Sequence, residues 1–212
     1  MRQFADILAK TVSVLLYPLF IPTYGIALFA YAFNRQVQAL PAVYWIILIC
    51  GTFIFTCLLP LSSILVMIRK GTVRDIQIEN AKERKMPYIY SIVSFCFWCY
   101  FLISVVHTPL YINVVGIGAT VAITLVAFIN RWWKISAHLT GLGGLLGGIF
   151  SFYLGVGTTA SIAMLCVWTA LTVILMASRL WLNAHTPAQV ICGWLLGLIC
   201  TFIPNAIISY VQ

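Results

Sequence analysis

The sequence predicts an all-α polytopic membrane protein, a bundle of six or seven transmembrane helices. Hydrophobic residues make up 63% of the 212 residues and charged residues only 8%, against about 25% charged residues in an average soluble domain. The apolar residues form long continuous runs, and a bilayer-crossing helix needs about 20 of them. The strands of a membrane β-barrel would instead alternate apolar and polar residues, so a β-barrel is not predicted. These observations exclude a soluble domain, a disordered chain and a coiled coil.

Seven apolar runs are the predicted crossings. They cover residues 11–33, 44–68, 88–106, 110–129, 139–155, 159–177 and 188–210. Pro18 and Pro22 fall within the first run, so this crossing should be irregular. The first ten residues lack a small-residue cleavage site after a short apolar core, and we expect no cleaved signal peptide. Nothing repeats at a fixed period, so residues 1–212 are expected to form a single integral membrane domain.

Glycines recur at four-residue spacing in the second half of the chain. The pairs are Gly143-x-x-x-Gly147, Gly144-x-x-x-Gly148 and Gly193-x-x-x-Gly197. Small residues at this spacing allow helix backbones to approach closely in lipid. Helix packing is therefore the preferred interpretation of these glycines.

Three polar breaks separate the runs, at residues 69–87, 131–138 and 178–187. Two runs lie between each break and the next, so the chain should return to the same side of the membrane each time. Eleven of the twelve Lys and Arg residues then share that side with the N-terminus, and Arg35 alone lies opposite. The positive-inside rule predicts that this side faces the cytoplasm. The net charge of +8 indicates contact with anionic lipid headgroups and not with nucleic acid.

The second and third breaks contain two of the three histidines. His138 and His185 each stand at the start of an apolar run, with a hydroxyl and a cation nearby. Imidazole can act as a nucleophile or as an acid near neutral pH, and arginine presents a forked donor that matches phosphate oxygens. Two imidazoles and several cations around one pocket would suit phosphoryl transfer through a covalent histidine intermediate.

This arrangement resembles the type 2 phosphatidic acid phosphatase superfamily, which includes bacterial lipid phosphatases and vanadium haloperoxidases. The signatures of that family are K-x6-RP, PSGH and SR-x5-H-x3-D. Ser178, Arg179 and His185 match the third signature, and Ser136 and His138 retain the Ser and His of the second. The signatures span about residues 82–189, roughly half of the chain.

The resemblance implies a role for each matching residue. His185 would attack phosphorus, and His138 would protonate the leaving alkoxide and later help to activate water. Arg179, Ser136, Ser178 and backbone amides would hold the phosphate oxygens. The implied reaction is metal-independent and cofactor-free hydrolysis of a lipid phosphomonoester or pyrophosphate, such as phosphatidate, phosphatidylglycerophosphate or a prenyl pyrophosphate.

One departure from the family pattern lies four residues after the expected nucleophile, where Gln189 replaces an aspartate. The glutamine carbonyl can accept the Nδ1–H of His185 and orient the ring, but it supplies no charge. The segment from Thr186 to Gln189 also fits a capping box with proline at the first helical position. The two interpretations are compatible.

The first signature is also altered, since alignment on Pro87 places Met86 at the arginine position and Glu79 at the lysine position. Other cations are available to hold phosphate, and they are Lys82, Arg84, Lys85 and Lys134. The alternative is that residues 69–87 form a solvated loop that faces lipid headgroups.

Two further function classes follow from these departures. A catalytically weakened relative would bind or translocate lipid phosphates without hydrolysing them. A transporter has less support, because no acidic residue lies within a predicted crossing to couple ions. The resemblance implies the bacterial cytoplasmic (inner) membrane with a site on its outer face, whereas the charge distribution favours the cytoplasmic face. We expect the cytoplasmic face.

Overall fold

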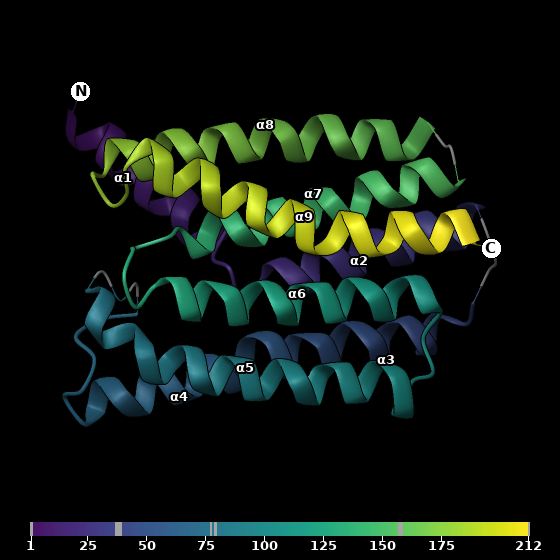
Figure 1. The fold of residues 1–212 in the computed structure, drawn as a ribbon, viewed down its shortest axis with the longest axis horizontal. Coiled ribbons are helices and arrows are strands. Elements are labelled where there is room, and N and C mark those ends of the chain that lie inside the picture. Colours follow the sequence, from purple (N-terminus) through teal and green to yellow (C-terminus); the bar gives the residue numbers. More distant parts are fainter. Residues whose placement is uncertain (1, 37–39, 77, 79, 157–158, 212) are drawn as a thin grey trace.

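The chain forms a bundle of long helices that lie roughly side by side (Figure 1). In this computed structural model the described residues are 2–36, 40–76, 78, 80–156 and 159–211, and no strand occurs within these ranges. Six helical segments are long and apolar enough to cross a bilayer. The prediction of an all-α integral membrane bundle is therefore confirmed.

Most helix bounds agree closely with the apolar runs. The helices are α1 (Arg2–Leu15), α2 (Ile21–Gln36), α3 (Ala42–Phe53), α4 (Leu59–Arg69), α5 (Lys85–Tyr100), α6 (Leu110–Ile129), α7 (Ala137–Val156), α8 (Thr159–Trp181) and α9 (Pro187–Val211). A π-helical turn, η1 (Ile54–Leu58), joins α3 to α4, a second, η3 (Phe101–Val105), extends α5, and the 3₁₀ turn η2 (Ala81–Arg84) precedes α5.

The first apolar run is broken, as its prolines predict. Helix α1 ends at Leu15 and α2 begins at Ile21, with Pro18 between them and Pro22 in the first turn of α2. One boundary differs from expectation, because α1 begins at Arg2 and not near residue 11. Together α1 and α2 make a seventh passage along the bundle, and the two ends of the chain lie at opposite ends of it (Figure 1).

Helix α7 is the central helix of the bundle. About two thirds of its span is buried (67%), against 22–33% for the other five long segments. Its closest partner is α9, and a Cβ atom on Gly143 or Gly197 would overlap the backbone of the opposite helix. The interpretation as packing residues is confirmed for Gly143, Gly147, Gly193 and Gly197, whereas Gly144 and Gly148 have room for a Cβ atom.

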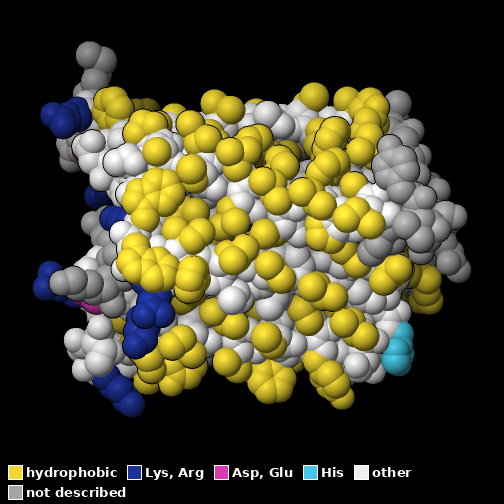
Figure 2. Space-filling model, viewed as in Figure 1, with side chains coloured by type: hydrophobic (Ala, Val, Ile, Leu, Met, Phe, Trp, Pro, Cys, Tyr) yellow, Lys and Arg dark blue, Asp and Glu magenta, His cyan; other side chains and the backbone are white. Residues whose placement is uncertain are grey.

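The lateral surface is apolar. Figure 2 shows hydrophobic side chains over most of the visible face, with Lys and Arg side chains gathered at one end. Helices α5, α7 and α9 begin at this end and α4, α6 and α8 finish there (Figure 1). We call it the site end. The three polar breaks share it, as the count of crossings predicts.

Candidate functional site

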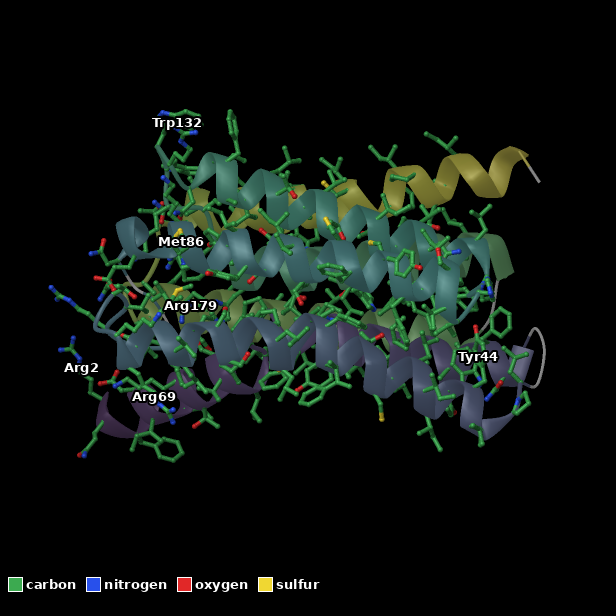
Figure 3. All side chains as sticks on the ribbon, turned by 90° about the horizontal axis from the view of Figure 1, so that it is seen from below. Arg2, Tyr44, Arg69, Met86, Trp132 and Arg179 are labelled. Carbon is green, nitrogen blue, oxygen red and sulfur yellow. The ribbon has the colours of Figure 1, made fainter. Side chains whose placement is uncertain are left out.

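A cavity opens among the helices at the site end. Arg84, His138 and His185, one residue from each polar break, line it together. Its volume is about 150 Å³. In Figure 3 the labelled Arg179 lies at the same end as Met86 and Trp132. The cavity therefore unites three segments that are far apart in the sequence.

His185 is held by the turn between α8 and α9. Helix α8 ends in a Schellman motif, in which the Ala184 N–H bonds to the Arg179 carbonyl at 3.1 Å and the Asn183 N–H to the Leu180 carbonyl at 3.0 Å. Asn183 takes the left-handed conformation that this motif requires (φ 51°). The reversal brings His185 back to the cavity, two residues before α9 begins.

A backbone carbonyl fixes the tautomer of His185. Its Nδ1 lies 3.1 Å from the carbonyl oxygen of Lys134, and since a carbonyl only accepts, Nδ1 must carry the proton. The unprotonated Nε2 then keeps its lone pair. Burial, followed by the charges of Arg179 and Arg84, lowers the pKa of His185 from 6.5 to about 4. The ring is therefore neutral at pH 7.

The Gln189 side chain contacts both His185 and the start of α9. Its side-chain oxygen lies 3.3 Å from His185 Nδ1 and accepts the Thr186 N–H at 3.1 Å. The Gln189 N–H in turn bonds to the Thr186 hydroxyl at 3.4 Å, which completes a capping box with Pro187 at the first helical position. The residue that starts α9 therefore also faces the imidazole.

His138 lies in the first turn of α7 and is almost completely buried. Its Nε2 lies 3.2 Å from the carbonyl oxygen of Ser13 in α1, so Nε2 is the protonated nitrogen of the neutral ring. The ring of Tyr17 packs edge-on against it, with centroids 5.4 Å apart. The broken first crossing thus orients this histidine.

Two buried guanidinium groups surround the imidazoles. Arg84 lines the cavity, and its Nε donates to the Ile78 carbonyl at 2.7 Å while Nη1 makes a long 3.5 Å bond to the Asn130 side chain. Arg179 is only 2% exposed, and its charge acts on both His138 and His185. Of the described carboxylates, which are Asp6, Asp75 and Glu83, none lines the cavity. The site end of the cavity is therefore positively charged.

Arg179, Gln189 and the remaining predicted residues lie outside the cavity lining. Ser136 is fully buried and caps α7, with its hydroxyl 3.5 Å from the Leu139 N–H. The Ser178 hydroxyl donates to the Ile174 carbonyl at 2.8 Å within α8. Lys134 contributes its carbonyl to His185 and Lys85 is exposed. The side chain of Lys82 lies outside the described residues.

Several lining residues were not predicted. Tyr17 and Tyr88 line the site end of the cavity, and Ile78 joins them with a positive φ of 45°. Such a backbone conformation is rare for a β-branched residue and tends to cluster at functional sites. The interruption of the first run by Pro18 and Pro22, which both line the cavity, was the available signal for Tyr17.

The seven cysteines are free thiols, and in the described part of the chain no three His, Cys, Asp or Glu side chains come together to hold a metal ion. The arrangement instead offers a neutral imidazole, a second imidazole and two guanidinium groups. Helices α5, α7 and α9 also begin at the site end, where helix dipoles favour an anion.

Comparison of the chain with protein-family models, with curated proteins and with solved structures finds no match. The assignment of a function therefore depends on the chemistry of the cavity.

Proposed function

We propose that this protein is a membrane lipid phosphatase that removes phosphate from a lipid phosphomonoester or pyrophosphate through a phosphohistidine intermediate. The observation that carries the proposal is the convergence of Arg84, His138 and His185 on one cavity that continues into an apolar interior. A phosphate group fits the cationic end, and the hydrocarbon of the same molecule fits the rest. The resemblance of the SR-x5-H segment to type 2 phosphatidic acid phosphatases agrees with this chemistry.

In the first step Nε2 of His185 attacks phosphorus, and the bond between phosphorus and the leaving oxygen breaks. The Lys134 carbonyl and the Gln189 side chain accept from Nδ1–H and stabilise the cationic ring that forms. Arg84 and Arg179 balance the negative charge of the transition state. In the second step water attacks the phosphohistidine, and the bond between Nε2 and phosphorus breaks to release inorganic phosphate.

His138 exchanges the protons of both steps. Its Nε2–H is held by the Ser13 carbonyl, so Nδ1 is the nitrogen assigned to this task. On binding, Nδ1 takes the acidic proton of a substrate phosphate monoanion and then passes it to the leaving alkoxide. In the second step Nδ1 takes a proton from the attacking water and returns it to the departing phosphate. The reaction thus balances without a metal or another cofactor.

The test is phosphate release by purified protein in lipid nanodiscs. Phosphatidate, phosphatidylglycerophosphate and a prenyl pyrophosphate are the substrates, and vanadate should inhibit. His185→Ala should lower kcat at least about a thousandfold, because removal of a nucleophile abolishes the covalent route. His107→Ala is the matched control, since His107 lies between η3 and α6 at the opposite end of the bundle. Full activity of His185→Ala would contradict the mechanism.

A second candidate is a protein that binds or moves lipid phosphates without turnover. Gln189 favours it, because an amide stabilises the imidazolium less than a carboxylate does. Gln189→Glu keeps the length of the side chain and both hydrogen bonds and adds the charge. A charge-assisted bond is stronger by about 1 kcal/mol, so kcat should rise roughly fivefold in an enzyme. Stoichiometric binding with no turnover in either protein would favour the second candidate.

We place the protein in the bacterial cytoplasmic membrane with the cavity open toward the cytoplasm. By sequence position, eleven of the twelve Lys and Arg residues fall in segments near the site end of the bundle. Cytoplasmic loops of membrane proteins carry an excess of Lys and Arg.

A further inference from the structure

The cavity extends far beyond the histidines. Its deep lining includes Phe29, Trp98, Val115 and Gly148. Between His138 and Gly148, helix α7 rises roughly 15 Å, which is about half of a hydrocarbon core of about 30 Å. The cavity is therefore polar at the membrane surface and apolar toward the middle of the bilayer.

The volume of the cavity suits one hydrocarbon chain. A group of the size of a water molecule or a methylene occupies about 30 Å³. At about 150 Å³ the cavity therefore has no room for two chains side by side along the 15 Å of α7 estimated above.

Glycines of α7 keep the cavity open on one side. Gly144 and Gly148 line it, and a Cβ atom on either would have only ordinary contacts, at 3.5 Å from Thr201 Cγ2 and 3.6 Å from Val115 Cγ2 respectively. Gly143 and Gly147 differ, because a Cβ atom there would overlap α9. The helix thus has one glycine face for packing and another where side chains are missing beside the cavity.

Aromatic rings close the deep end. Phe29 packs against Tyr111 and Phe152, with ring centroids 5.3 and 5.6 Å away. The Tyr111 hydroxyl bonds to the Gly148 carbonyl and lies 2.7 Å from the Ser151 hydroxyl. These hydrogen bonds hold Tyr111 beside Gly148, and the aromatic rings packed there form the deep end of the cavity.

We propose that the substrate is a single-chain lipid phosphate whose hydrocarbon chain lies inside this cavity, and that Gly144, Gly148 and Phe29 set the chain length it accepts. The inference rests on the proposed function. Charge complementarity supports the occupant, since the buried cation Arg84 and the two imidazoles face the phosphate while apolar side chains face the chain. A hydrocarbon chain that is longer than the cavity must leave it between the helices.

Binding is the primary measurement, so that the result does not depend on hydrolysis. Hexyl, decyl and hexadecyl phosphate compete with a fluorescent decyl phosphate for His185→Ala protein in nanodiscs. Adding Gly148→Leu should lower the affinity for decyl and hexadecyl phosphate at least about tenfold, because each methylene excluded from an apolar site lowers affinity about fourfold. The affinity for hexyl phosphate should change less than about twofold. Phe29→Leu should instead raise the affinity for hexadecyl phosphate.

The control is Ala163→Leu, which adds similar bulk to an exposed surface of α8 and should leave all three affinities unchanged. A hexadecyl phosphate with a terminal diazirine should label residues near Phe29 and lose this labelling in Gly148→Leu. The proposal is overturned if chain length has no effect on the variants, if dioleoyl phosphatidate binds as tightly as decyl phosphate, or if the diazirine labels only lipid-facing residues. If the affinities follow the proposal but no phosphate is ever released, the cavity assignment stands and the phosphatase assignment fails.

Discussion

The state of His185 is set by burial, by two arginines and by a backbone carbonyl. Arg179 and Arg84 disfavour a second positive charge, and burial adds to the effect. The Lys134 carbonyl accepts a hydrogen bond from the protonated Nδ1. The result is a neutral ring with a fixed orientation, as the proposed reaction requires of it before a substrate binds. A phosphate dianion would then offset the cations that hold the pKa low.

This state predicts the pH dependence of His185. Diethyl pyrocarbonate modifies neutral imidazole, so its rate at His185, read by peptide mass spectrometry, should have a midpoint near pH 4. Arg179→Gln should move the midpoint upward, because one cause of the low pKa is removed. Since an imidazole in the unfolded chain takes up its proton near pH 6.5, this group should also lower the stability of the fold as the pH falls from 6.5 to 4. A wild-type midpoint near pH 6.5 would contradict the assignment.

Helix ends, more than helix interiors, build the site. The capping box of α9 and the Schellman motif of α8 bracket His185, and Ser136 caps α7 beside His138. These local motifs are readable in the sequence. They deliver each histidine to the end of a helix, where its backbone is already ordered.

The close contact of α7 with α9 predicts different effects of alanine on two glycines. Gly197→Ala should lower the Tm of the protein in detergent, because its Cβ would overlap the Thr140 carbonyl and overpacking costs about 1–3 kcal/mol. Gly144→Ala is the matched control, since its Cβ has room and alanine favours a helix by up to about 1 kcal/mol. Equal Tm values for the two variants would argue against this contact.

The bundle as a whole separates its charge by ends. Basic side chains gather at the site end (Figure 2). The turn between η3 and α6, which contains His107, lies at the opposite end (Figure 1). A single orientation in the membrane follows from this asymmetry.

Labelling of single cysteines should report that orientation. In a cysteine-free background, Asp75→Cys and His107→Cys both place a thiol at an exposed position. A membrane-impermeant maleimide added to intact cells should label position 107 and reach position 75 only after lysis. Labelling of position 75 in intact cells would reverse the orientation.

Much of this architecture was predictable because lipid imposes few choices. Apolar runs of sufficient length must be helices, and the parity of the crossings brings Arg84, His138 and His185 to one end. Pro18 and Pro22 predicted the break between α1 and α2. The four-residue spacing of glycines predicted the close contact of α7 with α9. Each of these features depends on short-range pattern.

The contacts of the histidines had no such pattern. The carbonyl of Ser13 beside His138, the carbonyl of Lys134 beside His185 and the carbonyl of Ile78 beside Arg84 are backbone atoms, which every residue possesses and no motif marks. The apolar depth of the cavity is similar, because Gly143 and Gly144 are alike in the sequence and differ only in which neighbour each one faces. Composition and periodicity thus set the helices and their order, while the packing of distant segments set the tautomers, the cavity and its length.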